Sequence, residues 1–281
     1  MQPGTLYVVA TPLGNLEDIT LRALRVLKEV ALIAAEDTRH SRKLLAHYSI
    51  RTPLTSYYDQ IERHKAPHLV EEIKHGKSIA LISDAGTPGI ADPGYHLVRA
   101  AIAAGVRVEA VPGPSAVAAA LSVAGLPTDR FLFEGFVPSR QGARQKFFAA
   151  LAREERTIVV YETARRLEAC LHDLHAALGA RPLVIIRELT KMFEEIVRGT
   201  VSDILARLKD HVLQGEITLV IGGAEAGERQ ESAEDLSTAI ERLRGEGLGL
   251  KEIARTLSRE RGLSRRDIYQ AGLALGHQPE E

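Results

Sequence analysis

Short apolar runs alternate with segments of helical periodicity through the first 125 residues, a pattern typical of strands that are each followed by a helix. The runs that we interpret as strands are 6–10, 31–35, 53–57, 79–82 and 106–111. The first predicted helix follows Asp18 as its cap, the second contains Leu44 and Leu45, and the third covers 64–75. The fourth begins near Asp92, with Pro93 in its first turn, and the fifth covers 116–124. This order predicts a parallel sheet covered on both faces.

The pattern changes after residue 125. Strands are predicted at 131–136, 157–161, 183–187, 194–199 and 217–221, and helices at 141–153, 164–178 and 201–208. Only 188–193 separates the third of these strands from the fourth, which is too short for a crossover helix. Those two strands should therefore be antiparallel neighbours, and the second sheet should be mixed.

The last part of the chain has a helical pattern of its own. We expect an α/β fold with domains at 1–125 and 126–222, a polar linker at 223–234, and a helical tail at 235–281 that contains a possible helix-turn-helix. Between 251 and 266 the basic residues are Lys251, Arg255, Arg259, Arg261, Arg265 and Arg266, against the acids Glu252 and Glu260. This excess could contact phosphate, or it could be the solvated face of a helical cap.

Three strand ends carry unusual loops, at 11–15, 83–94 and 112–115. The carboxyl ends of parallel strands lie on one edge of a sheet, where open α/β sheets bind ligands, so these loops should converge. In the longest loop, Gly86, Gly89 and Gly94 allow positive φ and close approach to bare backbone. This predicts a ligand site, with Asp84 at its centre.

Composition limits the classes of protein to which the chain can belong. The 281 residues are 45% hydrophobic and 26% charged, with a net charge of −1, so there is no global attraction to nucleic acid. The single cysteine, Cys170, excludes an internal disulfide and is expected in the core. No apolar run is long enough to span a membrane, and no signal peptide is apparent, so we expect a cytoplasmic protein. His64, His68 and His75 should be exposed, and we expect no metal site.

Several common sites are missing from the sequence. No Gly-x-Gly-x-x-Gly follows the first strand, and there is neither a Gly-x-x-x-x-Gly-Lys-Ser/Thr loop nor a Gly-x-Ser-x-Gly elbow. What remains is a site of backbone and small residues. It suits a ligand with an amino acid end, a sugar and a flat base, such as S-adenosylmethionine.

An ordered set of motifs then carries a resemblance to a known family. The segments are GTLYVVATPLGNLEDIT at 4–20, AEDTR at 35–39, ISDAGTPGIADPG at 82–94, VPGPSA at 111–116, FEGFVP at 133–138, YE at 161–162, RELTK at 187–191 and GEITLV at 215–220. In this order they resemble the tetrapyrrole methylase superfamily, and within it the bacterial 16S ribosomal RNA cytidine 2′-O-methyltransferases. One departure is Thr163-Ala164, where the family pattern has Ser-Pro.

The resemblance implies a two-domain tetrapyrrole-methylase-like fold, S-adenosylmethionine as cofactor between the domains, and a homodimer. The implied reaction is 2′-O-methylation of a cytidine, number 1402 of 16S ribosomal RNA, within the small subunit. The implied cofactor contacts are Leu13, Ser83, Asp84, Ala85, Gly86, Ile90, Ser115, Ala116, Tyr161, Ile217 and Thr218. Asp84 could accept from the ribose or ammonium end, and the start of the helix after Ser115 suits a carboxylate.

A general base would help a ribose hydroxyl to lose its proton. Glu36, Asp37 and Lys191 are candidates, because they lie in loops that match the family motifs. Each has a structural alternative: Glu36 and Asp37 could cap the next helix or pair with Arg39, and Lys191 could close a turn through Glu188.

Basic residues predict where RNA would bind. Arg140, Arg144 and Lys146 lie in 139–146 without an acid, and Arg39 is a further candidate. The alternative for 139–146 is an exposed loop that opens a helix.

Two other functions stay open: methylation of a carbon in a tetrapyrrole precursor, and RNA binding without catalysis.

Overall fold

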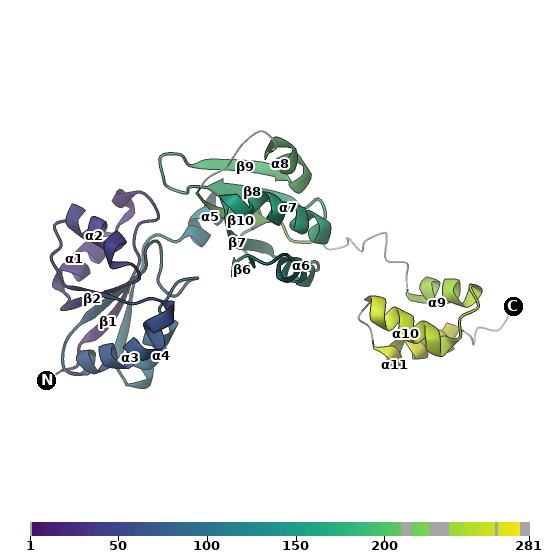
Figure 1. Ribbon diagram of the computed structural model, residues 1–281, viewed down its shortest axis with the longest axis horizontal. Coiled ribbons are helices and arrows are strands. Elements are labelled where there is room, and N and C mark those ends of the chain that lie inside the picture. The colour runs from purple at the N-terminus through teal and green to yellow at the C-terminus, as the bar shows by residue number, and fades with distance from the viewer. Residues whose placement is uncertain (1, 209–214, 225–235, 262–263, 276–281) are drawn as a thin grey trace. The chain divides into compact units, whose positions relative to one another are not determined.

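The structure is a computed structural model that describes residues 2–208, 215–224, 236–261 and 264–275 (Figure 1). The chain divides into two compact units, Met1–Ala224 and Glu225–Glu281. Most of the predicted linker at 223–234 lies outside the described residues, and the predicted domain boundary at 125 stays a prediction.

The first sheet is parallel, as predicted. Its strands are β1 (Thr5–Val9), β2 (Leu32–Ala35), β3 (Leu54–Ser56), β4 (Ile79–Ile82) and β5 (Arg107–Val111). They lie in the order β3-β2-β4-β1-β5, and every described pairing is parallel. All the carboxyl ends, and the loops that follow them, therefore share one edge of the sheet.

Helices cover both faces of this sheet, which confirms the sequence prediction. The helices are α1 (Leu21–Glu29), α2 (Thr38–His47), α3 (Asp59–Lys74) and α4 (Tyr95–Ala103). Apolar residues of α1 and α2, such as Leu27 and Leu45, pack in one cluster with Ile33 and Val111. Residues of α3 and α4 pack in a second cluster with strand residues such as Leu81.

Two predicted helix starts were wrong. Asp18 ends a 3₁₀ turn, η1 (Leu16–Asp18), and the cap of α1 is Thr20, whose side chain accepts from the N–H of Ala23 at 3.1 Å. Helix α4 begins at Tyr95, three residues after Asp92. The Gly94 that precedes it has a φ of 150°, and its N–H donates to the Glu62 carboxylate at 3.2 Å. Asp92 therefore belongs to the loop.

The second sheet is mixed, as predicted. Its strands are β6 (Phe131–Phe136), β7 (Thr157–Thr163), β8 (Pro182–Arg187), β9 (Glu195–Thr200) and β10 (Glu216–Ile221), in the order β6-β7-β10-β8-β9. Among the described pairings of this sheet, β6 with β7 is the only parallel one, and β8 and β9 are antiparallel neighbours.

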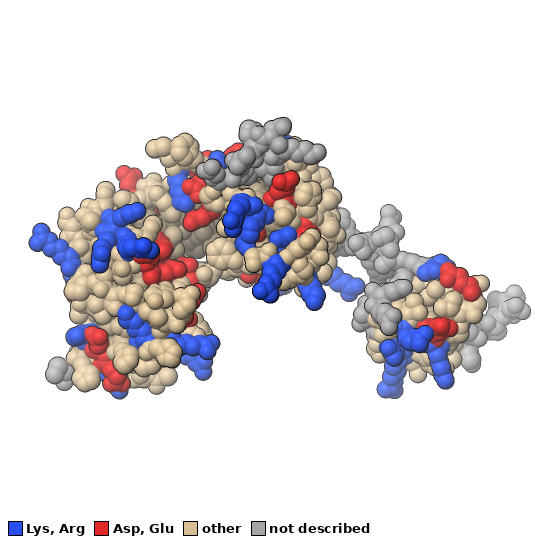
Figure 2. All heavy atoms as spheres, viewed as in Figure 1, with Lys and Arg blue, Asp and Glu red and all other residues tan. Residues whose placement is uncertain are grey.

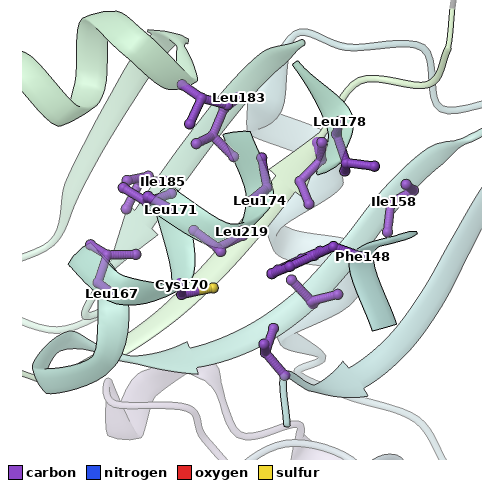
Figure 3. Packing of buried hydrophobic residues seen from close by; sticks show 14 of the residues in the cluster. Phe148, Ile158, Leu167, Cys170, Leu171, Leu174, Leu178, Leu183, Ile185 and Leu219 are labelled. Atoms are coloured by element: carbon purple, nitrogen blue, oxygen red, sulfur yellow. The ribbon is translucent and has the colours of Figure 1, made fainter. Parts of the chain in front are cut away.

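The two faces of the second sheet are covered by different parts of the chain. The helices α6 (Gln141–Ala150), α7 (Ala164–Leu178) and α8 (Val201–Leu208) pack on one face, in a cluster that includes Phe148, Leu219 and the buried Cys170 (Figure 3). Helix α5 (Ala116–Ala124) packs on the other face, against residues such as Val159 and Val220. Because α5 directly follows β5, the loop at 112–115 leads from the first sheet to the second.

The second unit has its own core. Its helices are α9 (Leu236–Gly245), α10 (Leu250–Arg261) and α11 (Arg265–Leu275), and its buried residues are Ala239, Ile240, Leu243, Ile253, Ala254, Leu257 and Ile268. Gly272 packs closely on Leu250, so a larger residue there would require the Leu250 side chain to shift. The turn of the predicted helix-turn-helix falls partly on 262–263, outside the described residues.

Across the part of the chain that the structure describes, no helix is both long and apolar enough to cross a membrane.

Candidate active site

The three strand-end loops meet, as the sequence predicted. Thr11 and Gly86 exchange two backbone hydrogen bonds, of 2.8 and 3.0 Å, and the Thr11 hydroxyl donates to the carbonyl of Ser83 at 3.1 Å. The Thr87 hydroxyl donates to the carbonyl of Pro114 at 3.1 Å. The loops at 11–15, 83–94 and 112–115 are therefore fixed to one another at the carboxyl edge of the parallel sheet.

Glycine is required in the longest loop. Gly86 and Gly89 have φ values of 77° and 82°, which L side chains rarely adopt. A Cβ on Gly86 would also lie 3.2 Å from Cδ2 of Leu13. The loop therefore presents bare backbone beside Leu13.

The other predicted cofactor contacts of the first sheet lie around this point. Ser83 is buried, Ala85 is half-buried, and Ile90 is exposed. Ser115 is the N-cap residue of α5, and Ala116 is the first residue of that helix. The Ser115 side chain makes no capping hydrogen bond, so it does not occupy the first N–H groups of the helix.

Carboxylates from neighbouring strand ends are linked through the backbone. The N–H of Asp84 donates to Oε2 of Glu36 at 3.3 Å, and the N–H of Asp37 donates to Oδ1 of Asp84 at 3.0 Å. Burial is the main cause that raises the pKa of Glu36, and the N–H of Asp84 acts in the opposite direction. Glu36 is therefore a stronger base than an exposed glutamate.

Asp92 is the residue that sequence reasoning missed. Burial raises its pKa to about 7, and the negative charge of Glu36 contributes next, followed by those of Asp84 and Asp59. The nearby Ser83 hydroxyl acts in the opposite direction. An acidic residue at the end of a glycine-rich loop is a local signal for such a site, but an Asp-Pro pair equally predicts a helix start.

Asp37 has both structural roles that the sequence left open. It is the N-cap of α2, and it pairs with Arg39 at 3.0 Å. Hydrogen bonds from the Arg39 side chain and backbone lower the pKa of Asp37 to about 2. Asp37 is therefore a weak base, and the guanidinium of Arg39 is exposed beside it.

Lys191 closes its loop, as its structural alternative predicted. Its Nζ lies 3.0 Å from Oε1 of Glu188 and 3.1 Å from Oε2 of Glu216. Burial lowers the pKa of Lys191, but the hydrogen bonds to the two glutamates outweigh it and the pKa is raised. Lys191 therefore carries its proton at neutral pH and cannot accept another. Its stem packs directly on Gly14.

Tyr161 brings the second sheet to these loops. The backbone N–H of Val117 in α5 donates to its hydroxyl, and burial together with the charge of Asp92 raises its pKa to about 12. Thr218 is buried opposite Tyr161 in the β7–β10 pairing. Ile217 lies in the apolar cluster under α7, so its side chain is committed to the core.

The predicted RNA contacts separate into two groups. Arg140 and Lys146 are exposed, at the cap and on the surface of α6. Arg144 is buried, and its guanidinium lies 2.6 Å from Oδ2 of Asp173 in α7. The periodicity of α6 turns Arg144 toward the core, so Arg144 is not part of the exposed basic surface proposed to contact RNA.

The histidines at 64, 68 and 75 are exposed on α3, as expected. Within the described residues, no group of His, Cys, Asp and Glu could hold a metal ion.

A solved structure shares the two-sheet fold. Uroporphyrin-III-C-methyltransferase from Thermus thermophilus superposes with a TM-score of 0.55 at 22% identity, over 77% of this chain and 94% of that chain. The family of Tetrapyrrole (Corrin/Porphyrin) Methylases matches residues 5–205, so the chain belongs to that family.

Relatives that match nearly the whole length of the chain indicate a narrower class of protein. The chain is 46% identical over 274 residues to "Ribosomal RNA small subunit methyltransferase I" of Synechocystis, which covers 97% of this chain and 98% of the relative. It is 43% identical to the protein of the same name in Haemophilus influenzae, over 96% of this chain and 97% of the relative.

Proposed function

We propose that the protein is an S-adenosylmethionine-dependent methyltransferase of the small-subunit ribosomal RNA, and that it methylates the 2′-oxygen of a cytidine in 16S RNA. The observation that carries this is the near full-length similarity to proteins of that name. The helical tail is part of the matched length, whereas the tetrapyrrole enzyme from Thermus thermophilus covers 77% of the chain.

The residues present fit S-adenosylmethionine. The bare backbone at Gly86 allows a ligand to approach closely, and the Asp84 carboxylate can accept from a hydroxyl or ammonium group. The start of α5, where the Ser115 side chain makes no capping hydrogen bond, suits a carboxylate. When bound, S-adenosylmethionine supplies an activated methyl group, so the protein mainly orients the reactants and removes a proton.

Asp92 is the group we assign to remove that proton. A base is most effective when its pKa lies near the working pH. Asp37, with a pKa of about 2, is too weak, and Lys191 is held protonated by its two glutamates. Asp92, with a pKa of about 7, accepts the proton of the 2′-hydroxyl, and Glu36 beside it keeps that pKa high.

A homodimer, a cytoplasmic location and an assembled small subunit as substrate complete the proposal. The net charge is −1, and the Lys and Arg side chains lie in separate groups among acidic ones on the visible face (Figure 2). The near-zero net charge and this face favour recognition of a structured ribosomal particle over free RNA, since binding of free RNA is driven by a basic surface.

Replacing Arg140 and Lys146 together by alanine should weaken RNA binding and reduce its salt dependence. Each contact with a single-strand phosphate contributes about 0.7 to the slope of log K against log salt, so the slope should fall by about 1.4. Filter binding of small subunits that lack the modification, across a salt series, measures this slope.

The matched control replaces Lys77 and Arg107, which are exposed at the amino ends of β4 and β5, the opposite edge of the sheet. Its slope should equal that of the wild type. An equal loss in both double variants would mean that Arg140 and Lys146 have no specific role.

The experiment that tests the function compares acceptors. Purified protein and labelled S-adenosylmethionine are incubated with small subunits that lack the modification, and separately with a uroporphyrinogen-type tetrapyrrole. We expect label in the RNA alone. Label in the tetrapyrrole alone would refute the proposal, and binding of RNA without transfer would indicate a non-catalytic protein.

A further inference from the structure

Strand β6 contains a bulge that re-aims its last residue, Phe136. The β6–β7 register shifts between Phe133 and Phe136, and Gly135 has a φ of 69°. Residues three apart on a regular strand lie on opposite faces. Here the rings of Phe133 and Phe136 both contact the ring of Tyr161, at centroid distances of 5.0 and 5.3 Å. The extra residue thus brings Phe136 to the face on which Tyr161 lies.

Phe136 is nevertheless exposed. It is 55% accessible, because β6 is an edge strand and α5 covers only the inner part of this face. Its ring packs against that of Tyr161 in an edge-to-face arrangement, with an angle of 64° between the two planes. A fixed and exposed aromatic ring is a surface on which another flat ring can stack.

The surroundings of Phe136 favour a nucleobase as the partner. On one side, Tyr161, which contacts Phe136, interacts with the charge of Asp92 and with the backbone of Val117 at the start of α5. On the other side, the chain continues into 137–146, which contains Arg140 and Lys146 at the surface and no acid. Proteins that read single-stranded RNA combine these two features, an aromatic side chain for the base and cations for the adjacent phosphates.

We propose that Phe136 is the stacking platform for the unstacked base of the nucleotide whose ribose is methylated. The inference rests on the proposed function. A base stacked on Phe136 lies beside Tyr161, so its ribose is directed toward Asp92, and its phosphates toward Arg140 and Lys146. The bulge at Gly135 is what brings these groups to one place.

Tryptophan fluorescence tests the contact directly, because the chain has no Trp. Phe136→Trp provides one fluorophore at the platform. Phe131→Trp is the matched control, since Phe131 is also exposed, at 45%, and lies at the far end of the same strand. Titration with small subunits that lack the modification should quench Phe136→Trp and leave Phe131→Trp unchanged.

A second set of variants measures the strength of the contact. Phe136→Ala should weaken RNA binding by about 5- to 150-fold, the range for loss of one base–aromatic stack. Phe136→Tyr should restore it, and the affinity for S-adenosylmethionine, measured by calorimetry, should stay the same in all three proteins.

Three outcomes would overturn the inference. RNA binding without quenching of Phe136→Trp would show that no base reaches the ring. Loss of binding together with a change in the oligomeric state of Phe136→Ala, by light scattering, would assign the ring to a contact between two copies of the chain. A wild type that neither binds nor methylates the RNA would refute the proposed function itself, and the inference with it.

Discussion

Asp92→Asn should lower kcat for RNA methylation by about 10²- to 10⁴-fold, the usual contribution of a general base. Asparagine keeps the size of the side chain but cannot accept the proton. The affinity for S-adenosylmethionine, measured by calorimetry, should change little, because the loss concerns proton transfer. A variant that keeps more than half of the wild-type kcat would exclude Asp92 as the base.

The pH profile separates this role from a structural one. With a pKa of about 7, Asp92 must be ionised to act, so the wild-type kcat/KM should rise with pH up to about 7 and then level off. Asp92→Asn should lose that rise. Asp59→Asn is the control: it removes an exposed charge that raises the pKa of Asp92, so its rise should shift to lower pH with little loss of rate.

Asp92 should also reduce stability at neutral and alkaline pH. Its pKa is raised in the folded chain, so folding favours the protonated form, and ionisation destabilises the fold as pH increases toward 7. Asp92→Asn should therefore have a higher Tm than the wild type at pH 8, and the difference should disappear below about pH 3, where Asp92 is protonated in both the folded and the unfolded state.

Arg144→Met should lower the free energy of unfolding by about 3–5 kcal/mol, because it leaves the carboxylate of Asp173 buried without its cation. The guanidinium Nε lies 2.7 Å from Oδ2 of Asp173, and Gln145 donates to Oδ1 at 2.9 Å. Urea unfolding measures the loss. Arg140→Met, at an exposed position, is the control and should change stability by less than about 0.5 kcal/mol.

The same pair predicts a pH dependence. Burial raises the pKa of Asp173, but hydrogen bonds from Gln145 and Arg144 outweigh it, and the pKa is lowered. The pair should therefore stabilise the fold above the ordinary aspartate pKa, and this contribution should be lost as pH falls through the lowered value. If Arg144→Met unfolded like the wild type but lost affinity for RNA, the structural role would be contradicted and Arg144 would be an RNA contact.

The parts of the fold that depend on local sequence were predicted correctly. The period of the apolar residues identified the strands of both sheets, and the short connection at 188–193 identified β8 and β9 as antiparallel. The three strand-end loops could be placed together because a parallel sheet puts all its carboxyl ends on one edge. Gly86, Gly89 and Gly94 of the longest loop have the positive φ values that its composition predicted.

What could not be predicted depends on partners distant in the chain. Arg144 is buried because Asp173 lies opposite it, and α4 begins at Tyr95 because Gly94 binds Glu62. The high pKa of Asp92 needs its burial and the charge of Glu36, which lies far away in the sequence. The bulge at Gly135 is different, because it could have been predicted from the local sequence: a glycine inside a strand pattern indicates a bulge.

The most direct test of the account is the position of the methyl group in the product. Small subunits that lack the modification are methylated with labelled S-adenosylmethionine, the RNA is digested to nucleosides, and these are separated and identified by mass. The account predicts that the label is found in 2′-O-methylcytidine. Label in a base-methylated nucleoside, or in no nucleoside while a tetrapyrrole is methylated, would contradict it.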